Sequence, residues 1–198
     1  MQNPVTRIVN QMVAKGVISE EDRELYSYSI FCLYIDLAPF LLGFLVGYSV
    51  KLNSVTILLF LLPFVMLRRF CGGYHAKSLG RCLLISIVFL VLFSLLIRLS
   101  FLFWQLKLVV YILSPIAGIS LMRFSPVDTS ERHLGISEML FYRKVVVILL
   151  SILFSIILTL TMMRRSQYSI PLSVGIIFTG ILQIPVIITK HCFHDQND

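Results

Sequence analysis

Six long apolar stretches set the strongest limit on what this chain of 198 residues can fold into. They cover roughly residues 30–50, 52–67, 83–104, 106–122, 145–163 and 170–189. A helix needs about 20 mostly apolar residues to cross the hydrocarbon core of a bilayer, and these stretches approach that length. Hydrophobic residues make up 58% of the chain and charged residues only 14%, which is more apolar side chain than a soluble domain of this size can bury. We therefore predict an all-α, polytopic membrane protein with about six transmembrane helices, forming a single domain over residues 1–198.

The second stretch is short and follows the first after a turn that contains Lys51 and Asn53. Residues 30–67 are therefore either a tight helical hairpin or a partly re-entrant segment. Inside the first stretch, Gly43 and Gly47 form a G-x-x-x-G pattern, which lets two helix backbones approach closely. This glycine face can serve a dimer or an internal contact, and we expect a homodimer.

The basic residues are distributed as membrane topology requires. The formal net charge is +7, but the cations lie in short clusters between apolar stretches, so we exclude nucleic acid as a partner. More of these cations fall in the segments that share a side with the N-terminus than in the segments on the opposite side. We expect both termini and the loop at residues 68–82 to be cytoplasmic.

Before the first stretch, apolar residues recur at the spacing of one helix face. They are Val5, Ile8, Val9, Met12 and Val13. The spacing predicts an amphipathic helix within residues 1–18 that lies on the membrane surface or, alternatively, packs on the protein's own core. Gly16 is expected to end this helix, and Ser19 with Asp22 predicts a weakened capping box for the next one.

The loop at residues 68–82 concentrates a thiol, an imidazole, paired glycines and four cations. A cysteine nucleophile needs a populated thiolate, which cationic neighbours, a base or a helix N-terminus can provide. If Ser78 is the N-cap of the third transmembrane helix, Cys82 lies in the first turn of that helix, where the helix dipole favours negative charge. Taken singly, such a cysteine is more often a small buried side chain, and His75 a solvated one. Together in this loop they predict a catalytic pair, with Cys82 as nucleophile and His75 as base.

The spacing of His75 and Cys82 requires a helix break between them. Seven residues along one helix would separate the two side chains by about 10 Å, too far for a hydrogen bond. Ser78 as an N-cap would supply the break. Gly72 and Gly73 would allow unusual backbone dihedrals, or leave amide donors for an oxyanion.

Cys71 is the rival nucleophile, because it lies four residues before His75. If residues 68–75 were helical, the two side chains would be neighbours. The two glycines between them argue against such a helix.

Other ionisable side chains leave alternatives open. Asp128 could orient His75 as a third member of the site, or cap a turn. Asp36 lies inside the first stretch, where an ionisable group is either a functional candidate or the partner of a cation such as Arg68. The His-Cys-Phe-His sequence at residues 191–194 could bind a metal, but a solvated tail is favoured, and we predict no metal and no cofactor.

The loop residues also carry a resemblance. Arg68-Arg69-Phe-x-Gly72-Gly73-Tyr74-His75-Ala76-x-Ser78, with Cys82 seven residues after the histidine, resembles the core motif of the AgrB family, membrane peptidases of bacterial quorum sensing. Ser125-Pro126-Val127-Asp128-Thr129 resembles that family's Ala-Pro-x-Asp-Thr stretch, although Glu131-Arg132-His133-Leu134 departs from the basic residues and proline expected next. The resemblance implies that Cys82 and His75 are catalytic and that Arg69 and Gly73 matter to the site.

The resemblance also implies a reaction and a partner. The enzyme would cut the C-terminal tail from an AgrD-like precursor peptide at the bacterial cytoplasmic membrane, and would cyclise the remainder through a thioester on Cys82. Basic residues near the site suit an acidic tail, and they are Arg68, Arg69, Lys77, Arg81, Arg123 and Arg132. Two other functions remain open: a small-peptide transporter or exporter whose path includes Asp36, and a non-catalytic scaffold that assembles through its glycine face.

Overall fold

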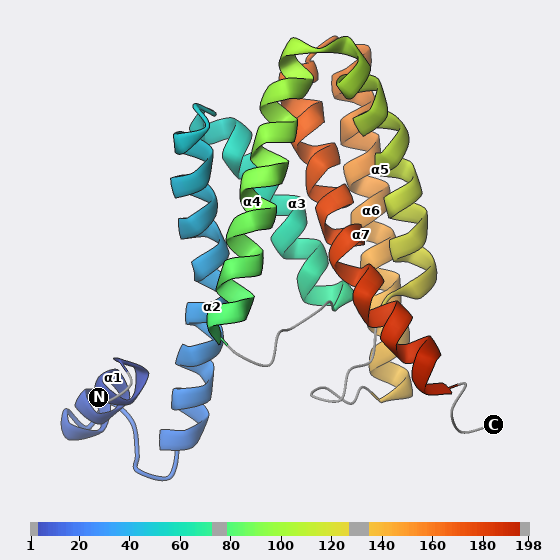
Figure 1. Cartoon of the computed structure of the whole chain (residues 1–198). Helices are drawn as coiled ribbons and strands as arrows, with labels where there is room; N and C mark the ends of the chain where they lie inside the picture. The colour runs from blue at the N-terminus through green and yellow to red at the C-terminus, as the bar shows by residue number, and fades with distance from the viewer. Residues whose placement is uncertain (1–3, 73–78, 127–134, 195–198) are drawn as a thin grey trace. The chain divides into compact units, whose positions relative to one another are not determined.

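The computed structural model describes residues 4–72, 79–126 and 135–194, which form helices and the connections between them. The helices are α1 (Pro4–Ala14), α2 (Arg23–Ser49), α3 (Ser54–Cys71), α4 (Leu79–Leu102), α5 (Trp104–Phe124), α6 (Ile136–Met162) and α7 (Ser166–His194) (Figure 1). No strand occurs in these three ranges, and the prediction of an all-α protein is confirmed.

Each of the six apolar stretches matches one of the helices α2 to α7, with at most two of its residues outside that helix. Five of these helices contain a segment long and apolar enough to cross a membrane. The segments are Ser54–Cys71, Leu84–Leu102, Trp104–Phe124, Ser137–Met162 and Ser166–Pro185. In the described part of α2, the apolar segment is the shorter Phe40–Ser49. The chain is therefore a multi-pass membrane protein with five such segments among its described residues, and the sixth span stays a prediction.

The chain divides into a first unit, residues 1–41, and a second unit, residues 42–198. In the first unit, α1 ends before Gly16, whose φ of 67° lies in the left-handed region that favours glycine. The Ser19 hydroxyl accepts the backbone N–H of Asp22 at 3.2 Å and donates to its carboxylate at 2.7 Å, directly before α2. The glycine that ends α1 and the contact between Ser19 and Asp22 before α2 therefore both occur where the sequence predicts them.

The apolar face of α1 is divided between two environments. Val5 and Val9 are buried in a cluster with Ile18, and Ile30 packs beside them. Ile8, on the same predicted face, is 47% exposed. Packing on the protein's own residues, one of the two alternatives, therefore holds for Val5 and Val9, while contact of α1 with a membrane surface stays a prediction.

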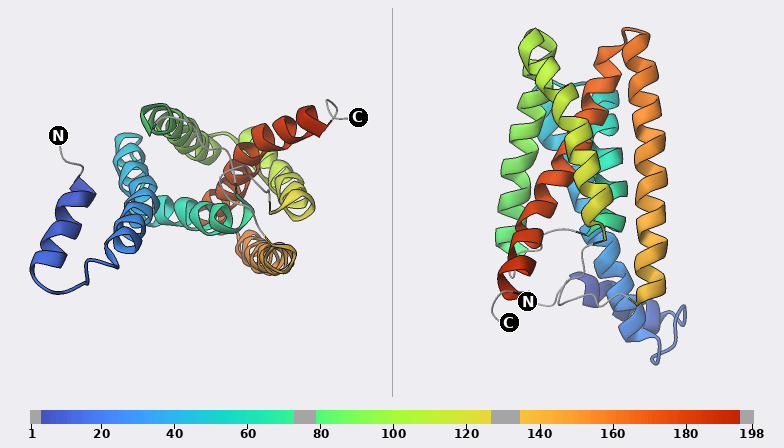
Figure 2. Two further views of the ribbon diagram at one scale, coloured as in Figure 1. Left: turned by 90° about the horizontal axis from the view of Figure 1, so that it is seen from below. Right: turned by 90° about the vertical axis from the view of Figure 1, so that its right-hand side faces the viewer.

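Helix α7 forms the centre of the second unit. Its segment Ser166–Pro185 is 72% buried, against at most 44% for the other four spanning segments. Small residues allow α7 to pack this closely against its neighbours. A Cβ atom at Gly175 would lie only 2.6 Å from the backbone oxygen of Phe60 in α3, so only glycine permits this approach. Helices α3, α5 and α6 lie around α7 and pack against it (Figure 2).

Helix α3 and the end of α2 form a hairpin, the first of the two predicted alternatives. Asn53 caps α3, since its Oδ1 accepts the backbone N–H of Thr56 at 2.7 Å. The guanidinium of Arg98 in α4 donates to the carbonyl oxygen of Val50 at 2.7 Å and so satisfies a free end of α2. With a rise of 1.5 Å per residue, α3 is about 27 Å long, which is close to the thickness of the bilayer core.

The G-x-x-x-G pattern faces α3. A Cβ atom at Gly43 would lie 2.6 Å from Cδ1 of Leu61, and one at Gly47 would lie 2.5 Å from Cγ1 of Ile57. Of the two alternatives for this pattern, the internal contact is therefore the one observed. The homodimer stays a prediction and would need a different surface.

Candidate functional site

Helix α3 ends at Cys71, and α4 is described from Leu79 onward. The break between His75 and Cys82 that their spacing requires stays a prediction, because residues 73–78 lie outside this description. Cys82 is the fourth residue of α4 as the structure describes it, Leu79–Leu102, and stabilisation of its thiolate by the helix dipole stays a prediction. His75, Gly73 and Ser78 fall outside the described residues, so the contact between His75 and Cys82 stays a prediction.

Gly72 closes α3 with a backbone conformation that other residues rarely adopt. Its φ is 73° and its ψ is −175°, a region that is essentially restricted to glycine. Its N–H donates to the carbonyl oxygen of Arg68 at 3.1 Å and so caps the helix. The unusual dihedrals that the paired glycines predict are confirmed at Gly72, and they direct the chain out of α3 toward the loop that contains His75.

Cys71 is enclosed by apolar side chains. It is 0% exposed and belongs to a core cluster with Leu67 of α3, Leu121 of α5 and Ile176 of α7. A cysteine buried in this way is generally inert, whereas a nucleophile needs access to its substrate. Because α3 ends at Cys71, the helix that would pair it with His75 does not form, as the two glycines predict.

Two loops leave the second unit at the same end. Helices α3 and α5 end there, and α4 and α6 begin there (Figure 1). Ser125 caps α5, with its N–H donating to the carbonyl oxygen of Leu121 at 3.0 Å. Asp128 lies in the second of these loops, outside the part of the chain that the structure describes. Its role in orienting His75 stays a prediction.

Exposed cations mark this loop end. Arg69 at the end of α3, Arg123 at the end of α5, and Arg143 with Lys144 near the start of α6 are all exposed. Arg68 is half-buried, with its guanidinium 6.0 Å from the ring centroid of Phe64. Of the basic residues predicted to meet an acidic peptide, three thus have described side chains at this end. Arg143 and Lys144 add to them.

A buried polar contact beneath the loops was missed by reasoning from sequence. Nε2 of Gln183 in α7 donates to Oγ of Ser125 at 2.9 Å, and Ser125 lies beside the thiol of Cys71. Gln183 is 0% exposed and Ser125 is 4% exposed. The available signal was the presence of a carboxamide inside an apolar stretch, where polar side chains usually form contacts between helices.

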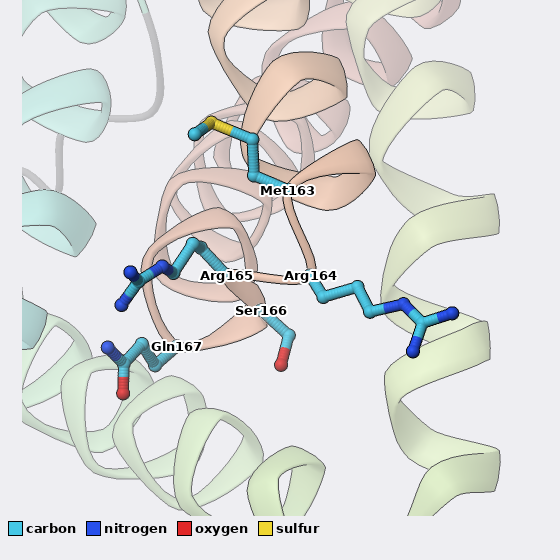
Figure 3. A pocket seen from close by; sticks show the side chains of 5 residues that line it. All are labelled: Met163, Arg164, Arg165, Ser166 and Gln167. Carbon is cyan, nitrogen blue, oxygen red and sulfur yellow. The ribbon is translucent and has the colours of Figure 1, made fainter.

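A cavity of about 330 Å³ lies at the opposite end of the unit, at the turn from α6 to α7. It is lined by Met163, Arg164, Arg165, Ser166 and Gln167. The side chains of Arg164 and Arg165 point in different directions and do not converge on one ligand (Figure 3). This cavity is therefore separate from the predicted site.

The remaining candidates are described only in part. Asp36 lies in α2 and residues 191–194 extend α7, but their side chains are outside what the structure describes. Among the side chains it does describe, no group of three or more His, Cys, Asp or Glu residues is placed to hold a metal ion.

Comparison with known proteins gives one family. The family model described as AgrB, Accessory gene regulator B, matches residues 5–187. This range includes all of α2 to α6, both loops and Gln183. A search of curated proteins and a search of solved structures gave no match.

Proposed function

This chain belongs to the AgrB family, and from that premise we propose that it is a membrane cysteine endopeptidase that cuts and cyclises a precursor peptide. Family membership gives it a role in the processing of agr quorum-sensing peptides. The proposed substrate is an AgrD-like precursor, from which the enzyme removes the C-terminal tail. The observation that carries the proposal is the position of Cys82 near the described start of α4, beyond the end of α3 at Gly72.

In the proposed reaction, His75 takes the proton of the Cys82 thiol, and the thiolate attacks the scissile carbonyl carbon. The peptide C–N bond then breaks, and His75 returns the proton to the departing amine of the tail. The product is an acyl-enzyme thioester between the peptide and Cys82. Gly72 and Gly73 are proposed to leave backbone N–H groups near the oxyanion. The reaction uses no metal and no cofactor.

The second half of the proposed reaction closes a ring. A cysteine or serine inside the bound peptide loses its proton and attacks the thioester carbonyl, and Cys82 leaves as a thiolate that regains a proton. The product is a thiolactone or a lactone. Exchange of one thioester for another is nearly isoenergetic, so exclusion of water and loss of the cut tail must drive the sequence.

The charge of the loop end supports an acidic tail as the group recognised. Arg69, Arg123, Arg143 and Lys144 are exposed there, and together they attract anionic peptide. An amphipathic precursor at the lipid surface would reach this end if it faces the cytoplasm, which is the proposed orientation. The enzyme is proposed to act as a homodimer.

The transporter alternative gains no support from the central helix. An export path through the second unit would need polar space beside α7, whose spanning segment is 72% buried against its neighbours. No observation favours export over peptide cleavage, and we therefore propose one function.

Intact mass spectrometry tests the proposal. The protein is held in nanodiscs with its verified precursor, and the unchanged chain is compared with Cys82→Ala and with Cys71→Ala as the matched control. We expect tail release and a peptide adduct on the unchanged chain and on Cys71→Ala, and neither on Cys82→Ala.

Two results would count against the proposal. If all three proteins leave the precursor whole, the peptidase function is wrong and export becomes the better candidate. If only Cys71→Ala fails, the enzyme class stands but the nucleophile is misassigned.

A further inference from the structure

Gln183 is a polar side chain buried inside a spanning segment. It is 0% exposed, and its Nε2 donates to Oγ of Ser125 at 2.9 Å. Its Oε1 is buried without a hydrogen-bond partner among the residues that the structure describes. Burying a carboxamide costs free energy unless both its donors and its acceptor are used. The free acceptor therefore has the capacity to take a donor from the adjoining loops.

The contact continues from Ser125 to Cys71. Oγ of Ser125 accepts from Gln183, and the Ser125 side chain lies beside the buried thiol of Cys71. This links α7, α5 and α3 through three adjoining buried side chains. We call Cys71, Ser125 and Gln183 the junction.

Both motif loops start at the junction. Cys71 is the last residue of α3 and directly precedes Gly72, from which the chain continues to His75. Ser125 caps α5 and directly precedes Pro126, from which the chain continues to Asp128. The junction thus ties together two residues that adjoin the loops and are 54 positions apart in the sequence, through a third residue on the central helix.

We propose that Gln183 is a positioning residue for the peptidase reaction. Its carboxamide holds Ser125, from which the second loop leaves α5, at a fixed point beside the end of α3. Gln183 touches no reacting atom. The inference rests on the proposed function, because its effect is on the rate of peptide cleavage.

The chain offers a matched control for simple helix packing. A second, part-buried hydrogen bond joins α5 and α7, between Oη of Tyr111 and Oγ of Ser169 at 2.6 Å. Ser169 is 0% exposed, as Gln183 is, but its bond lies near the start of α7 and far from the loops. A purely structural role would give Gln183→Leu and Ser169→Ala similar effects.

The experiment measures tail release from a precursor peptide by the full chain in nanodiscs. For Gln183→Leu we expect kcat to fall about 10- to 100-fold, the size of effect that a displacement of about 1 Å has on catalytic groups. KM should stay within about twofold, because the substrate does not touch the junction. Ser169→Ala should keep the kcat of the unchanged chain.

A double-mutant cycle tests the connection itself. Ser125→Ala should lower kcat to a similar extent, and adding Gln183→Leu to it should lower kcat little further, because the two changes break the same contact. If Gln183→Leu fails to fold, Ser125→Ala alone carries the test, with a fall in kcat at unchanged KM as the expected result.

Several outcomes would overturn the inference. These are an unchanged kcat in Gln183→Leu, an equal fall in Ser169→Ala, and independent effects that multiply in the double variant. If the unchanged chain does not cleave the precursor, the proposed function and this inference both fall. If it cleaves and the junction variants cleave equally fast, only the inference falls.

Discussion

The two ends of the second unit differ in how their helices are joined. At one end, which we call the turn end, short connections join α2 to α3, α4 to α5 and α6 to α7, and only Phe103 separates α4 from α5. At the other, the loop end, longer segments follow Cys71 and Ser125 and carry the motif residues. Short turns are specified by their own few residues, whereas long polar segments are free to hold catalytic groups.

Backbone hydrogen bonds close helix termini at both ends of the unit. At the turn end the N–H of Arg165 donates to the carbonyl oxygen of Leu160 at 2.8 Å, and at the loop end the N–H of Gly72 donates to the carbonyl oxygen of Arg68 at 3.1 Å. At the loop end, Gln183 and Ser125 form a buried side-chain contact where loops begin. The comparison predicts that changes at the turn end act on stability, and changes at the loop end act on catalysis.

The largest effect is expected from removing the proposed base. His75→Ala should lower kcat for tail release by about 10²- to 10⁴-fold, the usual contribution of a general base, with the protein level in the membrane unchanged. Single-turnover kinetics followed by mass spectrometry measure the rate. His191→Ala, near the end of α7, is the control and should cleave normally. Normal cleavage by His75→Ala would rule out His75 as the base, and with it the catalytic pair proposed at the loop end.

A smaller effect is expected at the glycine that ends α3. The strain of an alanine at φ 73° and ψ −175° costs about 1–3 kcal/mol, so Gly72→Ala should either lower the stability by this amount or displace the loop. We expect kcat to fall about tenfold, as for a modest displacement of catalytic groups. Thermal unfolding and tail release are measured on the same nanodisc sample.

Gly16→Ala is the matched control for that change. Gly16 also has a positive φ, of 67°, and a Cβ atom there would meet nothing within 4 Å. Alanine in this left-handed conformation costs about 1 kcal/mol, so stability should fall while kcat stays the same. Equal losses of activity in both variants would mean that backbone strain, and not the position of the loop, governs cleavage.

The sequence predicts the features of this molecule that depend on neighbouring residues better than it predicts contacts between distant ones. The positions of α3 to α7 follow from apolar stretches, although α6 begins at residue 136 and its predicted stretch at 145, and the end of α3 follows from the glycine pair after Cys71. Each of these depends on residues close together in the chain. The placement of Cys82 in the first turn of α4 depends on Ser78 as a cap, and it stays a prediction because Ser78 lies outside the described residues.

Contacts between distant residues were not predictable in this way. The pattern of Gly43 and Gly47 fits a dimer and an internal contact equally well, and only the position of α3 decides between them. The apolar face of α1 gives no sign that Ile8 stays exposed while its neighbours are buried. The contact of Gln183 with Ser125 joins residues 58 positions apart, and sequence spacing does not show which polar side chains in different helices will meet.

At the turn end, we expect an effect on stability alone. Arg98→Met removes the hydrogen bonds from the guanidinium to the carbonyl oxygens of Val50 and Lys51 and leaves a similar apolar stem. Hydrogen bonds from charged groups contribute about 1.5–3 kcal/mol each, and partial exposure of this site places the loss near the lower value. The unfolding temperature should fall and kcat should not. A fall in kcat without a fall in stability would break the division between the two ends.

The smallest effect concerns the cations, which occur at both ends. The double variant Arg69→Gln and Arg143→Gln removes two exposed charges from the loop end and should raise KM for an acidic tail about three- to tenfold at low salt, because exposed charges act weakly and are screened. Arg164→Gln with Arg165→Gln removes the same charge from the turn end and should leave KM unchanged. Raising the salt from 0.05 to about 0.5 M should cancel the difference, since the screening length then falls to a few ångströms.

Equal changes in KM from both pairs would show that the substrate senses only the total charge of the protein. The tail would then have no preferred end, and the siting of peptide recognition beside Cys82 would have to be abandoned even if cleavage itself were established. A rise confined to the loop-end pair, and lost at high salt, would place the tail and the nucleophile at the same end of the second unit. That result would also orient the protein, because the precursor could then be supplied only from the side on which α3 and α5 end.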